Sequence, residues 1–232
     1  MKRIGRGRKR ARKTRQPRLN ARPSARKARG IARVASAGRG REAFIAVVGI
    51  GASAGGLDAF RRFFSTVPPE SGMAFVLVQH LDPTHESLAA EVIGRYTAMP
   101  VVQVGGGDTP VRANHVYVIP PGKYLSIGGG SLRLIPPVEP GGIRMSIDLF
   151  LRTLAADAGE RAIGIILSGT GTDGTLGLQA IKAAGGMSIA QDPATAQYDG
   201  MPSSAIAAGA VDHVLPPERM PEIGRASCRE RV

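Results

Sequence analysis

Short apolar segments that alternate with helix-like segments constrain the fold of this chain more than any other feature. Three such segments lie at residues 44–50, 74–79 and 163–167, and each runs into a turn rich in glycine or polar residues. Strands that are apolar along their whole length are typical of a parallel sheet covered by helices on both faces. We therefore predict an α/β fold with a doubly wound, mostly parallel sheet flanked by helices.

The rest of the chain supplies further short elements. Pro-Gly and Gly-Gly-Gly separate three of the expected strands, as in hairpins, so the sequence also predicts an antiparallel β-hairpin insertion. The other expected strands are 116–119, 124–127, 132–135, 187–190 and 211–214, and the expected helices are 56–65, 87–96, 146–158, 174–184 and 203–208.

The charge of the chain is concentrated at one end. The formal net charge is +13, but residues 1–41 contain 17 Lys or Arg and no acidic residue. Residues 43–221 contain 11 basic and 15 acidic residues, so the globular part is mildly acidic and is not expected to bind nucleic acid. We interpret residues 1–42 as a basic disordered tail and 43–221 as the domain. Residues 222–232 read like a translated sequencing adapter, so we expect a non-native tail there.

Several classes of protein are excluded or disfavoured by composition. Cys228 is the only cysteine, so no disulfide can form within the chain and no cysteine-type metal cluster exists. No apolar run approaches the roughly 18–20 residues of a membrane span. The sequence predicts a cytoplasmic protein with no membrane insertion.

The first glycine-rich turn, residues 49–56, can be interpreted in two ways. As G-x-G-x-x-A it resembles a dinucleotide-binding fingerprint, and as G-x-S-x-G it resembles a nucleophile elbow that presents Ser53. A nicotinamide-binding unit would be expected to place an acidic residue after the second strand, where this chain has His80. Histidine cannot bind a ribose as a carboxylate does, but it can act as the general base for a serine at the neighbouring strand end. The histidine therefore favours the elbow.

A third candidate follows another strand. Residues 163–167 lead into a glycine-rich loop in which Asp173 stands just before an expected helix. One interpretation is that Asp173 only caps that helix. The other is that it orients His80 and stabilises its positive charge. Three candidates at three strand ends favour the second interpretation.

These motifs resemble the protein-glutamate methylesterase domain of bacterial chemotaxis, the CheB family. The resemblance extends from about Ala46 to Pro221. Its motifs are Gly-Ala-Ser-x-Gly-Gly at 51–56, Gln79-His80, Tyr117-x-Ile119-x-Pro121-Gly122, Ser146-x-Asp148, Gly169-x-Gly171-x-Asp173-Gly174, Ala190-Gln191-Asp192 and Gly200-Met201-Pro202.

The resemblance implies a serine hydrolase that needs no cofactor and no metal. Ser53 would be the nucleophile, His80 the base and Asp173 the supporting acid, with the main-chain N–H groups of Ala54 and Thr170 forming the oxyanion hole. The substrate would be glutamate methyl esters on methylated chemoreceptors, and the family also allows deamidation of glutamine.

The chain departs from the commonest family pattern. Ala54 replaces a threonine and Thr170 replaces a methionine, and residues 1–41 are not expected to form the phosphorylation receiver domain of the family pattern. These features resemble versions fused to a receptor methyltransferase and sensor modules, which we therefore expect as fused or associated partners.

Other functions stay open at this point. A non-catalytic regulatory or docking module could keep the same fold, although intact Ser53, His80 and Asp173 argue against it. A nucleotide-binding domain is disfavoured by His80. A metal site at His80 and His85 is disfavoured for two reasons. No third ligand is evident, and Pro83 breaks the helical spacing between the two histidines.

Overall fold

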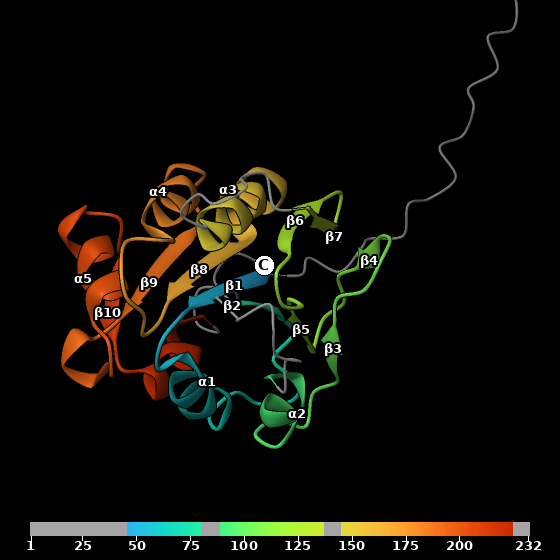
Figure 1. The fold of residues 1–232 in the computed structure, drawn as a ribbon, viewed down its shortest axis with the longest axis horizontal. Helices are drawn as coiled ribbons and strands as arrows, with labels where there is room; N and C mark the ends of the chain where they lie inside the picture. Colours follow the sequence, from blue (N-terminus) through green and yellow to red (C-terminus); the bar gives the residue numbers. More distant parts are fainter. Residues whose placement is uncertain (1–45, 80–88, 137–144, 225–232) are drawn as a thin grey trace, which may run out of the picture. The chain divides into compact units, whose positions relative to one another are not determined.

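The computed structural model describes residues 46–79, 89–136 and 145–224. Their main feature is a seven-stranded sheet in the order β10-β9-β8-β1-β2-β5-β3, in which every pair is parallel (Figure 1). The strands are β1 Val47–Ala52, β2 Ala74–Gln79, β3 Val101–Gln103, β5 His115–Val118, β8 Ala162–Ile166, β9 Met187–Gln191 and β10 His213–Leu215. This arrangement confirms the predicted doubly wound α/β fold.

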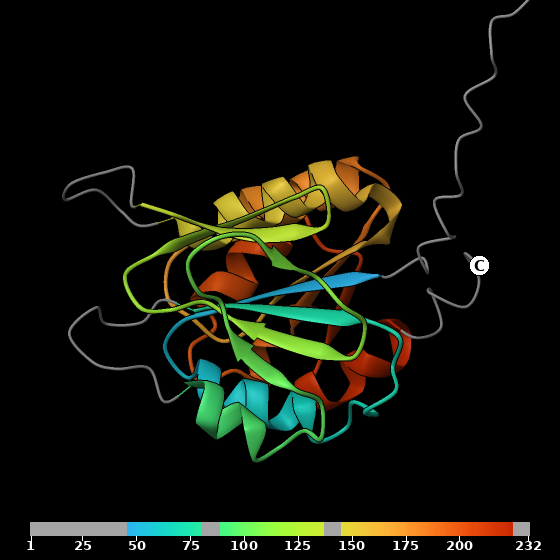
Figure 2. The same cartoon turned by 90° about the vertical axis from the view of Figure 1, so that its right-hand side faces the viewer.

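Helices cover both faces of this sheet, so these residues form three layers (Figures 1 and 2). On one face lie α1 Gly56–Phe64 and α2 Ala89–Gly94, and α1 contributes Phe60, Phe63 and Phe64 to one core cluster. On the other face lie α3 Ser146–Ala158, α4 Thr175–Ala183 and α5 Gly200–Ala207, whose apolar residues form the second cluster. Burial of apolar side chains on both faces explains why the strand sequences are apolar throughout.

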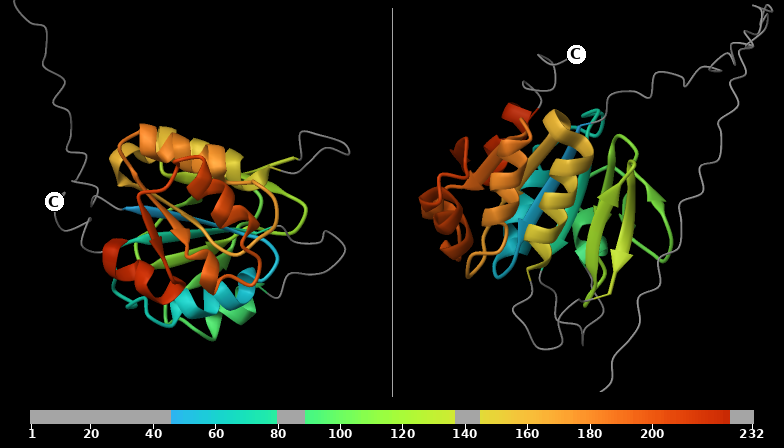
Figure 3. Two further views of the ribbon diagram at one scale, coloured as in Figure 1. Left: turned by 90° about the vertical axis from the view of Figure 1, so that its left-hand side faces the viewer. Right: turned by 90° about the horizontal axis from the view of Figure 1, so that it is seen from above.

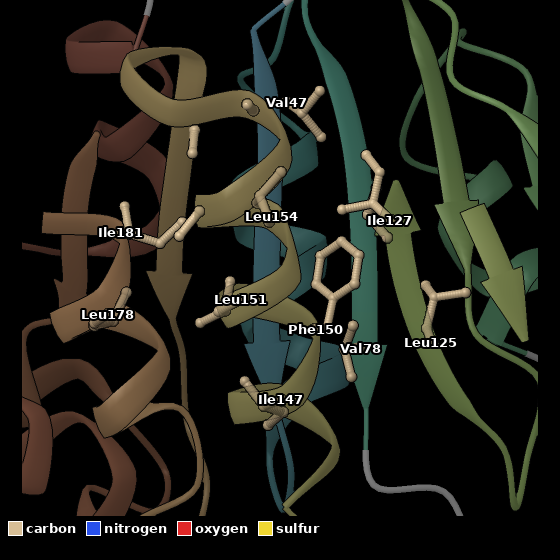
Figure 4. Packing of buried hydrophobic residues seen from close by; sticks show 14 of the residues in the cluster. Val47, Val78, Leu125, Ile127, Ile147, Phe150, Leu151, Leu154, Leu178 and Ile181 are labelled. Atoms are coloured by element: carbon tan, nitrogen blue, oxygen red, sulfur yellow. The ribbon is translucent and has the colours of Figure 1, made fainter. Parts of the chain in front are cut away.

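Strand β1 lies at the centre of the sheet and is itself covered closely by α3. A Cβ atom at Gly49 would lie 2.8–2.9 Å from Leu151, Leu154 and Phe150, and one at Gly51 would lie 2.3 Å from Ile147. Figure 4 shows this inner face of α3 against β1 and β2. Gly49 and Gly51, the first two glycines of the glycine-rich motif at 49–56, therefore let α3 pack closely against β1. A side chain at either position would push α3 away from the sheet.

A second, antiparallel sheet in the order β4-β7-β6 packs beside α3 (Figure 3). It consists of β4 Thr109–Pro110, β6 Tyr124–Gly128 and β7 Ser131–Ile135, and Gly129 and Gly130 turn the chain between the last two. The predicted hairpin insertion is thus confirmed for 124–135. The prediction for 116–119 was wrong in detail, because β5 pairs in parallel with β2 and belongs to the main sheet.

The final described segment is tied to α1. The chain forms the short 3-10 helix η3 Pro217–Arg219, and residues 220–224 are helical. Arg62 on α1 donates Nε and Nη2 to the two carboxylate oxygens of Glu218, each at 3.0 Å, and donates Nη1 to the Thr195 carbonyl at 3.1 Å. The predicted basic tail lies outside the described residues, as do 225–232.

Candidate active site

Ser53 lies directly after β1, in the turn that leads into α1. The turn is tight: the Gly56 N–H donates to the Ser53 carbonyl at 3.0 Å, and Gly55 has φ of 73°. A side chain at Gly55 would be strained by that φ and would lie 2.6 Å from Ser168 Oγ. Ser53 itself is half-buried. The sharp strand-to-helix turn expected of a nucleophile elbow is therefore present.

The exits of β1 and β8 are joined through Ser53 and Ser168. The Ser53 N–H donates to the Ser168 carbonyl at 3.0 Å, and Ser168 Oγ donates to the Ala54 carbonyl at 2.8 Å. Ser168 is only 1% exposed. One buried residue thus contacts the main chain on both sides of the Ser53–Ala54 peptide.

Ser168 is held in turn by the segment that follows β9. Its N–H donates to Gln191 Oε1 at 2.9 Å, and its Oγ accepts from the Tyr198 N–H at 3.0 Å. Gln191 Nε2 donates to the Thr195 carbonyl at 3.0 Å, which fixes the amide orientation. Gln191 occurs in a motif that the sequence analysis quoted and Ser168 directly precedes another, but neither was given a role.

Thr170 lies one residue beyond Gly169 in the loop after β8. The Gly169 carbonyl accepts from the Met201 N–H in the first turn of α5 at 2.9 Å. Because the C=O and N–H of a trans peptide point in opposite directions, the Thr170 N–H points away from α5. In the same way, the Gly56 N–H donates to the Ser53 carbonyl, so the Ala54 N–H of the same peptide points away from α1. Both predicted oxyanion donors therefore belong to peptides whose carbonyls are fixed by the start of a helix.

Asp173 is buried, 3% exposed, and its carboxylate caps a helix. Oδ2 accepts from the Ile147 N–H at 3.0 Å and Oδ1 accepts from the Asp148 N–H at 2.8 Å. Both donors are at the N-terminus of α3, whereas the N-cap residue of α4, the helix that follows Asp173, is Gly174, which has no side chain to cap it. The capping interpretation named the wrong helix, because the sequence separation of 25 and 26 residues hides the contact.

Asp148 provides the reciprocal contact. Its Oδ1 accepts from the Gly177 N–H in the first turn of α4 at 2.7 Å, while Oδ2 is buried without a hydrogen-bond partner among the described residues. Burial raises the pKa of Asp148, and the nearby charge of Asp173 raises it further, although backbone N–H donors such as Gly177 act in the opposite direction. The neutral form of Asp148 is therefore favoured more than that of an exposed carboxyl.

The predicted site residues are thus located as far as the described residues allow. Ser53 and Ala54 lie in the β1–α1 turn, and Thr170 and Asp173 lie in the β8–α4 loop that the Ser53–Ser168 hydrogen bond joins to it. Gln79, the last residue of β2, pairs with Ala52 at the end of β1. His80, the predicted base, lies outside the described residues, as does His85.

Neither a metal-binding cluster nor a membrane-spanning helix is present in the described part of the chain. It contains no group of three or more His, Cys, Asp or Glu side chains that could hold a metal ion. Nor does any helix in it have the length and hydropathy needed to cross a membrane.

The fold and the site define a class: a doubly wound α/β protein with a serine elbow at the carboxyl edge of its central strand. Residues 48–223 match the family model described as CheB methylesterase. The chain belongs to the CheB methylesterase family.

Similar proteins agree with this assignment. The crystal structure of the Thermotoga maritima CheB methylesterase catalytic domain has a TM-score of 0.71 and 29% identity, covering 78% of this chain and 97% of that one. A protein-glutamate methylesterase/protein-glutamine glutaminase of Anaeromyxobacter dehalogenans is 36% identical over 203 residues, which are 87% of this chain and 59% of that protein. An uncharacterized 104.1 kDa protein of Rhodobacter capsulatus is 45% identical over 131 residues, 56% of this chain and 14% of that protein. This chain therefore spans less than two thirds of these two relatives.

Proposed function

We propose that this chain is a serine esterase that hydrolyses glutamate methyl esters on methylated chemoreceptors. The observation that carries the proposal is the position of Ser53, in a tight strand-to-helix turn at the centre of the carboxyl edge, held by Ser168. The family supports the reaction class, since relatives over most of this chain are named protein-glutamate methylesterases. Their names also include protein-glutamine glutaminase, so deamidation of glutamine is part of the proposal.

The mechanism begins with activation of the serine. A serine hydroxyl is a weak nucleophile until a neighbouring base accepts its proton. We assign that base to His80, on the resemblance to the family. Ser53 Oγ attacks the ester carbonyl, its proton passes to His80, and the carbonyl oxygen becomes an oxyanion. The N-terminus of α1, three residues beyond Ser53, adds positive potential at this point.

The oxyanion would be bound by the Ala54 and Thr170 N–H groups. The fixed carbonyls of Ser53 and Gly169 support this role, because each sets the direction of the N–H in the same peptide. A donor that is oriented before the reaction stabilises the developing charge without reorganisation. His80 then protonates the departing methanol, and water, activated by the same histidine, releases the glutamate carboxylate and restores Ser53.

Asp173 would act on His80. In the proposal it accepts a hydrogen bond from the histidine and stabilises its positive charge. Its two hydrogen bonds from the start of α3 keep its carboxylate in a fixed orientation. Capping and catalysis are compatible, because each carboxylate oxygen can accept more than one hydrogen bond.

We extend the proposal to location and partners. A reducing cytosol suits a chain whose only cysteine is Cys228. A receptor methyltransferase and sensor modules are proposed as fused or associated partners, and sequencing the native gene beyond Pro221 would test the fused form. Co-purification from cells would test the associated form.

The reaction is tested with the full chain and a chemoreceptor cytoplasmic fragment carrying tritiated methyl esters. We expect labelled methanol to be released by the wild type and by Ser65→Ala, an exposed serine at the far end of α1, but not by Ser53→Ala. Equal release by Ser53→Ala would show that Ser53 is not the nucleophile. No release by a folded wild type from several receptor fragments would favour the regulatory or docking module instead.

A further inference from the structure

We propose that Ser168 is a positioning residue for both halves of the oxyanion hole. This inference rests on the proposed function, in which the Ala54 and Thr170 N–H groups bind the oxyanion. Ser168 touches neither N–H group. Instead, its hydrogen bonds hold the two segments that carry them.

The first segment is the turn that contains Ser53. The Ser168 carbonyl accepts from the Ser53 N–H at 3.0 Å, and its Oγ donates to the Ala54 carbonyl at 2.8 Å. These two bonds lie on either side of the peptide that carries the Ala54 N–H. They fix the two neighbouring peptides, and with them the Cα atoms of Ser53 and Ala54, so the position of the donor depends on Ser168. The Gly56 N–H on the Ser53 carbonyl then sets the direction in which the donor points.

The second segment is the loop from Gly169. Ser168 Oγ accepts from the Tyr198 N–H at 3.0 Å, and the Tyr198 carbonyl accepts from the Gly169 N–H at 2.9 Å. The Gly169 carbonyl in turn accepts from the Met201 N–H, which sets the direction of the Thr170 N–H. The hydroxyl of Ser168 therefore joins the segment before α5 to the turn that holds the nucleophile.

The geometry leaves this hydroxyl little freedom. A serine hydroxyl has one proton to donate, and the Ala54 carbonyl at 2.8 Å is the better acceptor than the Tyr198 carbonyl at 3.3 Å. Ser168 is 1% exposed, so water cannot readily replace either partner. Removing the hydroxyl would leave the Ala54 carbonyl and the Tyr198 N–H without this partner, and both segments could shift.

Ser188 offers a matched control. It is fully buried on β9, its Oγ donates to Asp212 Oδ2 at 2.8 Å, and it accepts from the Asp212 N–H at 3.1 Å. It lies near the amino end of β9, at the opposite edge of the sheet from Ser53. Ser188→Ala thus removes the same kinds of bonds without touching either oxyanion segment.

The experiment compares wild type, Ser168→Ala, Ser168→Cys and Ser188→Ala in the full chain. Methanol release gives kcat and KM, and the rate of labelling by a fluorophosphonate reports the reactivity of Ser53 without a receptor. We expect Ser168→Ala to lower kcat and the labelling rate by roughly 10- to 100-fold with little change in KM, as misplacement of reacting groups does. Ser188→Ala should keep both rates even where it lowers Tm.

Ser168→Cys keeps nearly the same volume but forms weaker hydrogen bonds, so it separates a cavity from a lost hydroxyl. We expect rates between those of the wild type and Ser168→Ala, and this variant decides the question if Ser168→Ala does not fold. Wild-type kcat and labelling in Ser168→Cys, or equal losses in Ser168→Ala and Ser188→Ala, would overturn the inference. If the wild type releases no methanol but is labelled, the labelling rates still test Ser168, while the proposed substrate is wrong. If the wild type is not labelled at all, both proposals fail.

Discussion

Asp148 and Asp173 cap two neighbouring helices: Asp173 accepts from the N–H groups at the start of α3, and Asp148, on α3, accepts from the Gly177 N–H in the first turn of α4. The contact ties the loop after β8 to a helix that precedes it by some 25 residues. It also places two carboxyl groups close enough for the charge of one to raise the pKa of the other. The loop that carries Thr170 and Asp173 is thus anchored from the face of the sheet covered by α3.

Replacing Asp173 should therefore have two separable effects. Asp173→Ala removes two buried hydrogen bonds to backbone N–H groups, which we expect to lower the free energy of unfolding by about 2 kcal/mol. If Asp173 also orients His80, methanol release should fall by roughly 10³- to 10⁴-fold. Denaturant unfolding and steady-state release measure the two effects on the same preparation.

Asp157 gives the control for this variant. Its carboxylate also accepts from two backbone N–H groups, those of Gly129 and Gly130 at 2.6 and 3.2 Å, but at the other end of α3. Asp157→Ala should lower stability and leave release unchanged. An Asp173→Ala protein that is less stable yet fully active would show that Asp173 caps α3 and does not orient His80.

Asp148 should make stability depend on pH in a defined direction. Its pKa is raised in the folded protein, mainly by burial, so the folded state binds the proton more readily than the unfolded chain. The stabilising contribution of the proton is complete below the unfolded pKa of about 3.9 and is lost as pH rises through the folded pKa. Asp148→Asn keeps an acceptor for Gly177 and carries no charge. Its stability should therefore increase relative to that of the wild type as pH rises.

Thermal unfolding of both proteins between pH 4 and pH 8 measures this difference. We expect the Tm of Asp148→Asn, relative to that of the wild type, to increase across this range. A relative Tm that stays constant or decreases would contradict the raised pKa. The same series on Asp157→Ala shows how much of the pH dependence comes from the rest of the protein.

The oxyanion role of Thr170 depends on its main chain and not on its side chain. Thr170→Ala keeps the N–H and should retain nearly full activity. Thr170→Pro removes the donor and should lower kcat by about 10²- to 10³-fold, as loss of one such donor does in other hydrolases. Steady-state release, with Tm as a check on folding, distinguishes the two. Similar kcat values for both variants would show that this N–H does not bind the oxyanion.

The sequence predicted the elements whose signals are local. The bounds of β2 and α3 were predicted to the residue, because a continuous apolar run ends at Gln79 and a helical pattern ends before Gly159. β3 and β4 were missed, since strands of three and two residues carry almost no pattern. The parallel pairing of β5 was missed because it depends on residues far away in the chain.

The same distinction applies to the site. Ser53 and Asp173 stand next to strand ends and glycines, and this local signal identified them as candidates. The partners of Asp173 and the contacts of Ser168 lie 23–115 residues away, so only the fold reveals them. The two glycines that begin the motif at 49–56 were interpreted as turn residues, whereas they make room for α3.

The most direct test of the account is to identify the residue that forms the covalent intermediate. The full chain is incubated with a fluorophosphonate, digested, and analysed by peptide mass spectrometry, with Ser53→Ala as the comparison. We predict one modified peptide, with the phosphonyl group on Ser53, and no modification of that peptide in Ser53→Ala. Modification of another residue in the wild type, or equal labelling of Ser53→Ala, would contradict the assignment of Ser53 as the nucleophile.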